Sequence, residues 1–282
     1  MQNRYIIAVD LDGTLLSSDK TISKLNKHIL KRLEDEGHLI VLCSGRAFRS
    51  ISKFQDDIGL TKSPMVCYNG HRAVNRFDPS FKELKFQIPK DDAIKIYLEL
   101  KDDFLIQTTC ENDDTVYTDK EDLFLFNFFD TEGMKIKKGP INEILDGDLN
   151  TFVVRYKDYI DDANSKINER IAGFSKIKMR FWQDYAYSEL YLDGVSKSKT
   201  LKAVADFYNI PKERVLVFGD APNDVEMLND FPNSFFMCNG IEGLKHNAKY
   251  ITEFDNDHDG VAHELIKFFK LKWVPAHSFY TI

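Results

Sequence analysis

Hydrophobic and polar positions in the first part of the chain follow a strand, helix, strand rhythm. A short apolar run at residues 5–9 is followed, between residues 22 and 33, by apolar residues at helical spacing. A second apolar run at residues 39–43 leads into another helical stretch, and a third at residues 65–68 ends in Asn69-Gly70, a hairpin signal. Strands that alternate with helices in this way predict a parallel sheet with helices on its faces.

The middle of the chain has a different pattern. Residues 91–100 have helical periodicity, and several short strand-like runs follow without strict alternation of strand and helix. The first rhythm returns at Ser196, with a strand of the buried type at residues 214–218. The pattern predicts an α/β protein with a parallel-sheet core and an inserted α+β domain. We place the core at residues 1–82 and 189–282, and the insert at residues 83–188.

Composition limits the partners and the location of the protein. A net charge of −7 argues against a nucleic-acid binder with a broad basic surface. The four cysteines are far apart, as is typical of a reducing compartment. The apolar runs are too short for a signal peptide or for a membrane span of ~20 residues. We expect a cytoplasmic protein without membrane or nucleic-acid partners, either a monomer or a weak homo-oligomer. The apolar tail at residues 271–282 is expected to pack on the core or on another subunit.

Two carboxylates follow the first apolar run. Asp10 and Asp12 are two residues apart and Gly13 comes next, so a strand would point both side chains to the same side. Carboxylates this close repel each other and lose hydration. A bound cation or acid/base chemistry would explain the pair, whereas a solvated strand end with an Asp-Gly turn is the alternative without function.

Three further segments come at the ends of predicted core strands or at the start of a core helix, which is where open α/β sheets bind ligands. Ser44-Gly45 offers a hydroxyl and backbone N–H groups to an anion, although Ser-Gly is also a common turn. Lys197 opens a helix, where a cation is unfavourable unless an anion lies nearby. Gly219-Asp220 is followed by Asn223-Asp224, of which Asp224 could also be a helix N-cap.

The four segments together indicate phosphate chemistry. Asp10, Asp12 and Asp220 are hard oxygen ligands without a nearby histidine or thiolate, a set that favours Mg²⁺. Ser44 and Lys197 could hold a phosphate beside the ion. One carboxylate could attack phosphorus while a second moves the proton. The sequence therefore contains the parts of a two-step phosphate monoester hydrolase.

In this order, the segments resemble motifs I to IV of the haloacid dehalogenase superfamily. The long insert between the second and third motifs is similar to the C2-type cap, subclass B, of Cof-type phosphatases. Asn69-Gly70 and Asp259-Gly260-Val261 also resemble that subgroup. The resemblance covers nearly the whole chain and implies a Rossmann-like core, with a cap that opens and closes over the substrate and selects it.

The resemblance also implies a role for each site residue. Asp10 would be the nucleophile and Asp12 the general acid/base. Mg²⁺ would be held by Asp10, the Asp12 carbonyl oxygen and Asp220, with Asp224 holding the metal's waters or Lys197, or ligating directly. The phosphate would be bound by the remaining motif residues, which are Leu11 and Gly45 through backbone N–H, Ser44, Lys197 and Asn223.

The leading hypothesis is thus a Mg²⁺-dependent phosphatase for small phosphorylated metabolites, such as sugar phosphates. A sugar phosphomutase or phosphotransferase would use the same nucleophile, so the motifs do not separate the two. A catalytically silent ligand-binding or regulatory protein is a third alternative, but such a protein would be expected to lack one of Asp10, Asp12, Lys197 and Asp220. Within the insert, the aromatic residues Phe124, Phe126, Phe128 and Phe129 are expected to form cap core.

Overall fold

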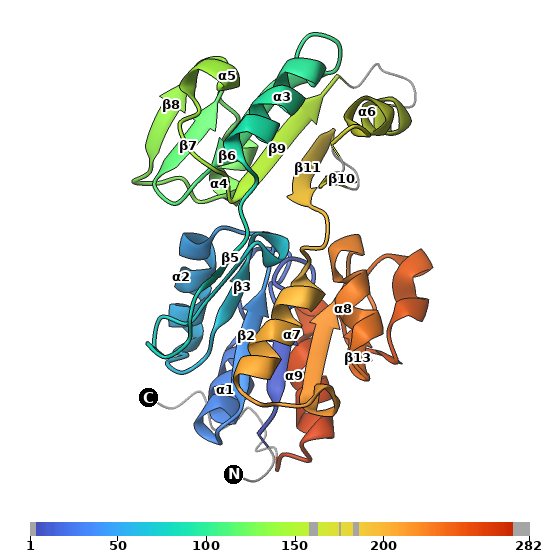
Figure 1. The fold of residues 1–282 in the computed structure, drawn as a ribbon. Helices are drawn as coiled ribbons and strands as arrows, with labels where there is room; N and C mark the ends of the chain where they lie inside the picture. Colours follow the sequence, from blue (N-terminus) through green and yellow to red (C-terminus); the bar gives the residue numbers. More distant parts are fainter. Residues whose placement is uncertain (1–3, 158–162, 175, 183–185, 273–282) are drawn as a thin grey trace.

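The computed structural model describes residues 4–157, 163–174, 176–182 and 186–272 and contains two sheets, one above the other in Figure 1. The larger sheet is formed by the two ends of the chain and the smaller one by the middle. This arrangement confirms the predicted α/β class with an inserted α+β part, which we call the cap. Of the predicted tail at residues 271–282, Leu271 packs against the core of the larger sheet, and residues 273–282 lie outside the described residues.

The larger sheet is mostly parallel. Its strands run in the order β14-β13-β12-β1-β2-β3-β4-β5, and all pairs from β14 to β3 are parallel. The last two strands are antiparallel, because a hairpin at Asn69-Gly70 joins β3 to β4 as the sequence predicts. The bounds are β1 Ile6–Val9, β2 Leu39–Cys43, β3 Met65–Cys67, β4 Arg72–Val74, β5 Leu84–Lys85, β12 Val215–Gly219, β13 Asn233–Phe236 and β14 Tyr250–Ile251.

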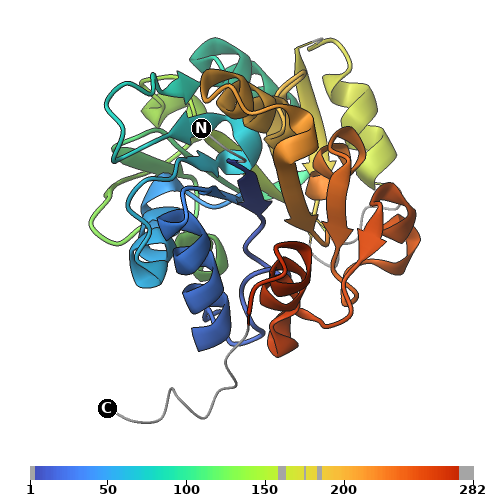
Figure 2. The same ribbon diagram turned by 90° about the horizontal axis from the view of Figure 1, so that it is seen from below.

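Helices cover both faces of this sheet (Figure 2). Successive side chains of a strand point to opposite faces, so Ile7 and Val9 pack against one group of helices and Ile6 and Ala8 against another. The first group is α1 Lys24–Asp35, α2 Phe48–Ile58 and α9 Gly260–Phe268. The second group is α7 Lys197–Phe207 and α8 Val225–Asp230. Burial on both faces explains why these strands are continuous apolar runs.

The cap sheet is mostly antiparallel, in the order β10-β11-β9-β6-β7-β8. Phe152 and Val154 point to the face covered by helices α3, α5 and α6, whereas Val153 points to the other face, beside α4. The bounds are β6 Leu105–Glu111, β7 Thr115–Thr118, β8 Lys135–Lys138, β9 Thr151–Tyr156, β10 Ile177–Phe181, β11 Tyr187–Leu192, α3 Lys90–Leu100, α4 Leu123–Phe128, α5 Ile141–Ile144 and α6 Ala163–Ile171.

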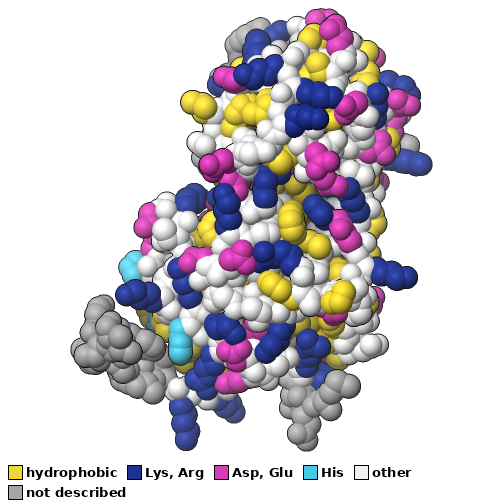
Figure 3. All heavy atoms as spheres, turned by 90° about the vertical axis from the view of Figure 1, so that its left-hand side faces the viewer, with side chains coloured by type: hydrophobic (Ala, Val, Ile, Leu, Met, Phe, Trp, Pro, Cys, Tyr) yellow, Lys and Arg dark blue, Asp and Glu magenta, His cyan; other side chains and the backbone are white. Residues whose placement is uncertain are grey.

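The chain leaves the larger sheet after β5 and returns to it after β11. The domain limits at residues 82/83 and 188/189 stay a prediction. On the face in Figure 3, basic and acidic side chains lie side by side across both parts of the molecule. Among the helices built from described residues, none combines the length and the apolar character that crossing a bilayer requires.

Candidate active site

Four segments of the chain meet at the carboxyl edge of the larger sheet. Asp10 directly follows β1, Asp220 directly follows β12, and these two strands are parallel neighbours. Ser44 follows β2, on the other side of β1, and Lys197 is the first residue of α7. Parallel strands bring the residues after their C-terminal ends to one edge. The structure therefore brings together the residues that the sequence predicts to meet.

Lys197 is the charged centre of this edge. It is completely buried, and its Nζ donates to Asp10 Oδ1 at 2.5 Å and to Asp224 Oδ1 at 2.7 Å. Burial alone would lower the pKa of Lys197, but the two carboxylates outweigh it and raise the pKa above its ordinary value. The lysine stays charged, and the carboxylates provide the anions that a cation at a helix N-terminus requires.

Asp10, Asp220 and Asp224 form a group that can hold a metal ion, because one oxygen of each lies within 4.8 Å of the others. Burial raises the pKa of Asp10 and of Asp220, and the charge of Asp224 raises both further. A cation would relieve this cost, and the all-oxygen donor set suits a hard ion. One oxygen of Asp220 accepts from Thr14 Oγ1 at 2.7 Å, which orients the carboxylate.

Both carboxylate oxygens of Asp224 accept hydrogen bonds from the protein itself. Its Oδ1 accepts from Lys197, and its Oδ2 accepts from the backbone N–H groups of Asp220 at 3.1 Å and Ala221 at 3.2 Å. The carboxylate is completely buried. Asp224 therefore fixes both the lysine and the loop that carries Asp220.

Asp12 lies in a separate environment. Arg46 binds it with two nitrogens, Nε to Oδ2 at 2.7 Å and Nη2 to Oδ1 at 2.8 Å, and Lys20 Nζ donates to Oδ1 at 3.0 Å. Burial acts to raise the pKa of Asp12, but these two cations outweigh it and hold the pKa below its ordinary value. Neither cation was predicted from the sequence as a site residue. The position of Arg46, immediately after Ser44-Gly45, is the signal that could have found it.

Backbone and amide groups complete the core side of the site. Ser44 is buried and its Oγ accepts from the N–H of Arg46 at 3.2 Å. A Cβ on Gly45 would lie 2.9 Å from the Nδ2 atom of Asn69, so this position requires a small residue. Asn223 Nδ2 donates to Asn69 Oδ1 at 2.9 Å. The side chain of Leu11 is buried in the core, so only its backbone can face a ligand.

Asn69, which the sequence indicated only as part of a hairpin and of the family resemblance, links the core to the cap. Its backbone has a φ of 54°, a left-handed conformation that asparagine tolerates. Its Nδ2 donates to Glu189 Oε2 at 2.7 Å, and Glu189 belongs to β11 of the cap sheet. Asn223, Asn69 and Glu189 therefore form a chain of contacts from one sheet to the other. Only the packing of the insert on the core brings these residues together.

A cavity of about 660 Å³ lies between the two sheets. The core side of its wall includes Asp10, Asp12, Ser44, Gly45, Arg46 and Asn223, and the cap side includes Phe124, Phe128, Trp182, Arg180 and Glu189. The prediction that the aromatic residues of this segment form cap core is thus wrong for Phe124, which is 40% exposed, whereas Phe128 packs against the buried cluster around Leu125 and Phe129 and also borders the cavity. Helix α4 lies on the face of the cap sheet opposite α3, α5 and α6, so its ring positions 124 and 128 border the cavity, whereas Phe129 is only 1% exposed.

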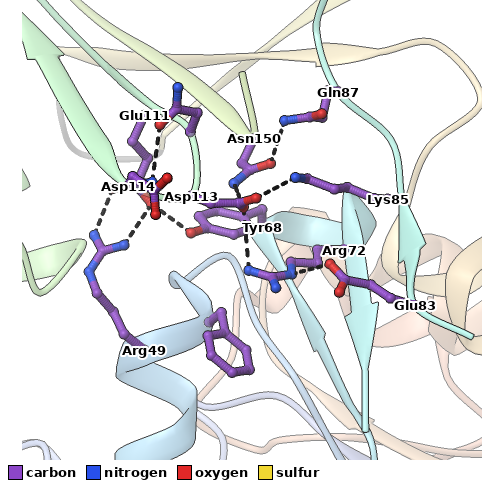
Figure 4. A network of polar contacts seen from close by, with 12 residues as sticks. Arg49, Tyr68, Arg72, Glu83, Lys85, Gln87, Glu111, Asp113, Asp114 and Asn150 are labelled. Carbon is purple, nitrogen blue, oxygen red and sulfur yellow. Dashed lines mark hydrogen bonds and ion pairs between the residues drawn. The ribbon is translucent and has the colours of Figure 1, made fainter. Parts of the chain in front are cut away.

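A polar network joins the core and the cap beside this cavity (Figure 4). Arg49 of α2 donates hydrogen bonds to Glu111 of β6 through Nη1 at 3.2 Å and Nη2 at 2.6 Å. The hydroxyl of Tyr68 donates a third hydrogen bond to Glu111 Oε1 at 2.6 Å. Nearby, Lys85 binds Asp113 at 2.5 Å. The side chain of Glu111 is 1% exposed, so its charge depends on partners from the other part of the protein.

The comparisons with known proteins agree with this geometry. The sequence pattern of a family described as haloacid dehalogenase-like hydrolase matches residues 7–265. The chain is 31% identical over 277 residues to a 5-amino-6-(5-phospho-D-ribitylamino)uracil phosphatase of Bacillus subtilis, covering 95% of this chain and 98% of that protein. A second phosphatase of this name from Bacillus subtilis is 26% identical and covers 91% and 95%.

The fold is similar to that of solved structures. A haloacid dehalogenase-like hydrolase from Bacteroides thetaiotaomicron superimposes with a TM-score of 0.79 at 23% identity, covering 94% of this chain and all of that one (100%). A Thermotoga maritima protein superimposes with a TM-score of 0.78 at 22% identity, covering 96% and 98%. The likeness extends over the core and the cap together.

Proposed function

The chain belongs to the haloacid dehalogenase-like hydrolases, and on this basis we propose that it hydrolyses phosphate monoesters of small metabolites with Mg²⁺ and an aspartyl-phosphate on Asp10. That the protein is a phosphatase follows from the family and from relatives named as phosphatases. The ion, the nucleophile and the substrate are the parts proposed here. The observation that supports them most is the buried Lys197, which donates hydrogen bonds to Asp10 and Asp224 at the C-terminal end of β1.

Asp10 is the proposed nucleophile. Lys197 holds its Oδ1, which fixes the carboxylate while its other oxygen attacks phosphorus. A new O–P bond forms as the bond from phosphorus to the ester oxygen breaks. Water then attacks phosphorus, the bond to Asp10 breaks, and inorganic phosphate leaves. The positive charge of Lys197 offsets the charge that accumulates on the phosphoryl oxygens.

Asp12 is the proposed group that moves the proton, first to the ester oxygen and then from the attacking water. Arg46 and Lys20 keep it ionised in the structure, whereas the first step needs it protonated. A phosphate dianion that enters the site would compete for the same two cations. We propose that this competition raises the proton affinity of Asp12 when the substrate arrives.

The metal site is assigned to the carboxylates of Asp10 and Asp220, with Asp224 behind them. These oxygens lie close together, and the charges of the neighbouring carboxylates raise the pKa of Asp10 and of Asp220. Mg²⁺ prefers one or two carboxylates together with water and a phosphate oxygen. When bound, the ion would neutralise the phosphate and lower the repulsion between it and Asp10. Asp12 would contribute a backbone carbonyl, as the family resemblance implies.

The substrate is proposed to be a small phosphorylated metabolite, because the cavity of about 660 Å³ between core and cap has the size of a small-molecule site. The two relatives named above make 5-amino-6-(5-phospho-D-ribitylamino)uracil the first compound to assay, and sugar phosphates the second. We also propose a cytoplasmic location. All four cysteines are free, and Cys43, Cys67 and Cys110 are buried.

Release of inorganic phosphate from a panel of phosphorylated metabolites tests the proposal. We expect turnover with Mg²⁺, none with EDTA, and none for Asp10→Asn with either. Asp206→Asn is a matched control, since Asp206 is an exposed acid of α7 that lies outside the site. Full activity of Asp10→Asn would disprove the nucleophile. An isomeric sugar phosphate in place of free phosphate would instead identify a mutase.

A further inference from the structure

We propose that Phe124, Phe128 and Trp182 form an aromatic wall that binds a planar heteroaromatic ring carried by the alcohol part of the phosphate ester. The inference rests on the proposed phosphatase function and specifies the class of substrate. A substrate of this class has a phosphate at one end and a ring with oxygen acceptors at the other. The three residues of the wall would then determine specificity without touching the reacting atoms.

The three rings are adjacent and belong to two different cap segments. Phe124 and Phe128 are four residues apart on α4, with ring centroids 6.5 Å apart and planes 20° from parallel. Trp182 follows β10, and its ring centroid lies 5.1 Å from that of Phe128 and 6.3 Å from that of Phe124. All three line the cavity. Together they present one continuous apolar surface to a bound molecule.

Exposure separates Phe124 from the core of the cap, whereas Phe128 and Trp182 are partly buried and pack against the cluster around Leu125 and Phe129. Phe124 is 40% exposed although it is a large aromatic residue, whereas Phe129 in the next turn is 1% exposed. A ring that serves only packing is expected to be covered. Rings left open beside a catalytic site are typical of sites that stack planar ligands, since every heteroaromatic ring has a π-face to offer.

The wall is continuous with the catalytic groups. The guanidinium carbon of Arg46 lies 5.4 Å from the centroid of the Phe128 ring, and the same guanidinium binds Asp12. A molecule on the wall is therefore close to the group that would protonate its leaving oxygen. The apolar surface belongs to the same cavity as Asp10 and Asp12, so the phosphate and the ring can be parts of a single ligand.

A hydrogen-bond donor stands at the edge of the cavity. Arg180 lines it, and its Nη1 atom is buried without a hydrogen-bond partner among the residues that the structure describes. It forms an ion pair with Glu189 Oε2 at 3.6 Å, too long for a hydrogen bond, and this oxygen already accepts from Asn69. Buried donors are normally satisfied. A carbonyl oxygen on the edge of a ligand ring would supply the missing acceptor, and this favours an oxygen-bearing heteroaromatic ring over a hydrocarbon ring.

The test compares two phosphate esters that differ only in the ring. One carries a pyrimidine ring on a ribityl 5-phosphate chain, and the other is D-ribitol 5-phosphate. For the wild-type protein we expect kcat/KM to be at least about tenfold higher for the ester with the ring, within the roughly 5- to 150-fold range of one stacked base. Trp182→Ala and Phe124→Ala should each remove most of this ratio, because they lower kcat/KM for the ester with the ring much more than kcat/KM for ribitol phosphate.

Controls separate specificity from folding. Leu123→Ala changes a residue of α4 that is 75% exposed, so it should leave the ratio unchanged. Trp182→Phe keeps an aromatic face and should restore most of the ratio. Phe128 is not used in the test, because it also lies against Arg46. Equal kcat/KM for the two esters, or an equal loss on both in Trp182→Ala, would overturn the aromatic wall while the phosphatase function stands. No phosphate released from either ester would overturn the proposed function as well.

Binding gives a readout that does not depend on catalysis. The chain has two tryptophans, so Trp273→Phe in an Asp10→Asn background leaves Trp182 as the single reporter. We expect the ester with the ring to quench its fluorescence with saturation, and ribitol phosphate to leave it unchanged. Quenching to the same extent by both esters, or by neither at saturating concentration, would contradict stacking on Trp182.

Discussion

Replacing Arg49 by methionine would leave a buried charge at the junction of core and cap. The guanidinium donates two hydrogen bonds to Glu111 and also binds the carbonyl of Asp130 at 2.5 Å. Glu111 is 1% exposed, and without Arg49 it would keep only the hydroxyl of Tyr68. Removal of one partner of a buried ion pair typically costs about 3–5 kcal/mol. Because Arg49 is 20% exposed, we expect the lower end of that range.

Protonation of Glu111 sets an upper limit to this cost. Burial already raises the pKa of Glu111 above its ordinary value of 4.5, and Arg49 opposes the shift, so loss of Arg49 raises the pKa further. To protonate a glutamate of ordinary pKa costs about 3.4 kcal/mol at pH 7 and about 0.7 kcal/mol at pH 5, at 1.36 kcal/mol per pH unit. Glu111 in the folded variant keeps its proton to a higher pH than in the folded wild type, so the stability of the variant relative to wild type falls as the pH rises above the wild-type pKa of Glu111, which itself lies above 4.5.

Urea unfolding followed by circular dichroism at pH 5 and pH 7 measures this effect. We expect Arg49→Met to lose about 3 kcal/mol at pH 7 and about 2 kcal/mol less than that at pH 5. The double variant Arg49→Met/Glu111→Gln should recover most of the loss at pH 7, because the amide removes the buried charge. The reasoning would be refuted by the same loss at both pH values, or by a double variant as unstable as the single one.

The other predictions concern the site and its surroundings. Gly13→Ala should weaken Mg²⁺ binding at least about tenfold in calorimetric titration, because a Cβ there would lie 2.3 Å from Asp220 Oδ2 and the residue has a φ of +80°. Lys197→Met should lower kcat about 10²- to 10³-fold in a phosphate-release assay, since a preorganised charge is lost; activity within twofold of wild type would contradict its role. His71 is buried, and burial lowers its pKa below 6.5, so the unfolded chain binds a proton that the folded one does not. Stability should therefore fall as the pH drops below about 6.5, and this loss should be smaller in His71→Gln when urea midpoints are compared.

The sequence was sufficient to predict the core side of the site, because element order decides it. Asp10, Ser44 and Asp220 each come directly after a strand of one parallel sheet, so topology alone brings them to one edge. The hairpin at Asn69-Gly70 followed from turn chemistry in the same way. Local pattern and connection rules are enough for residues of this kind.

Contacts across the junction could not be predicted in this way. Asn69 meets Glu189 only because the cap packs on the core, 120 residues apart in sequence. Phe124 and Phe129 have the same apolar character, yet one is open to the cavity and the other is buried, and that difference depends on which face of the cap sheet α4 covers. Arg46 lies between these two cases. The sequence indicates its position after β2, but it does not predict the two hydrogen bonds to Asp12.

The aspartyl-phosphate on Asp10 is the claim on which the rest of the account depends. A turnover reaction quenched within its first cycle and treated with borohydride would convert an acyl phosphate into the reduced side chain, homoserine, at the position that carried it. Peptide mass spectrometry then reads that position. We predict homoserine at position 10, only with substrate and Mg²⁺ present, and none in Asp10→Asn. Reduction at another residue, or turnover at full rate with position 10 always unmodified, would contradict the mechanism.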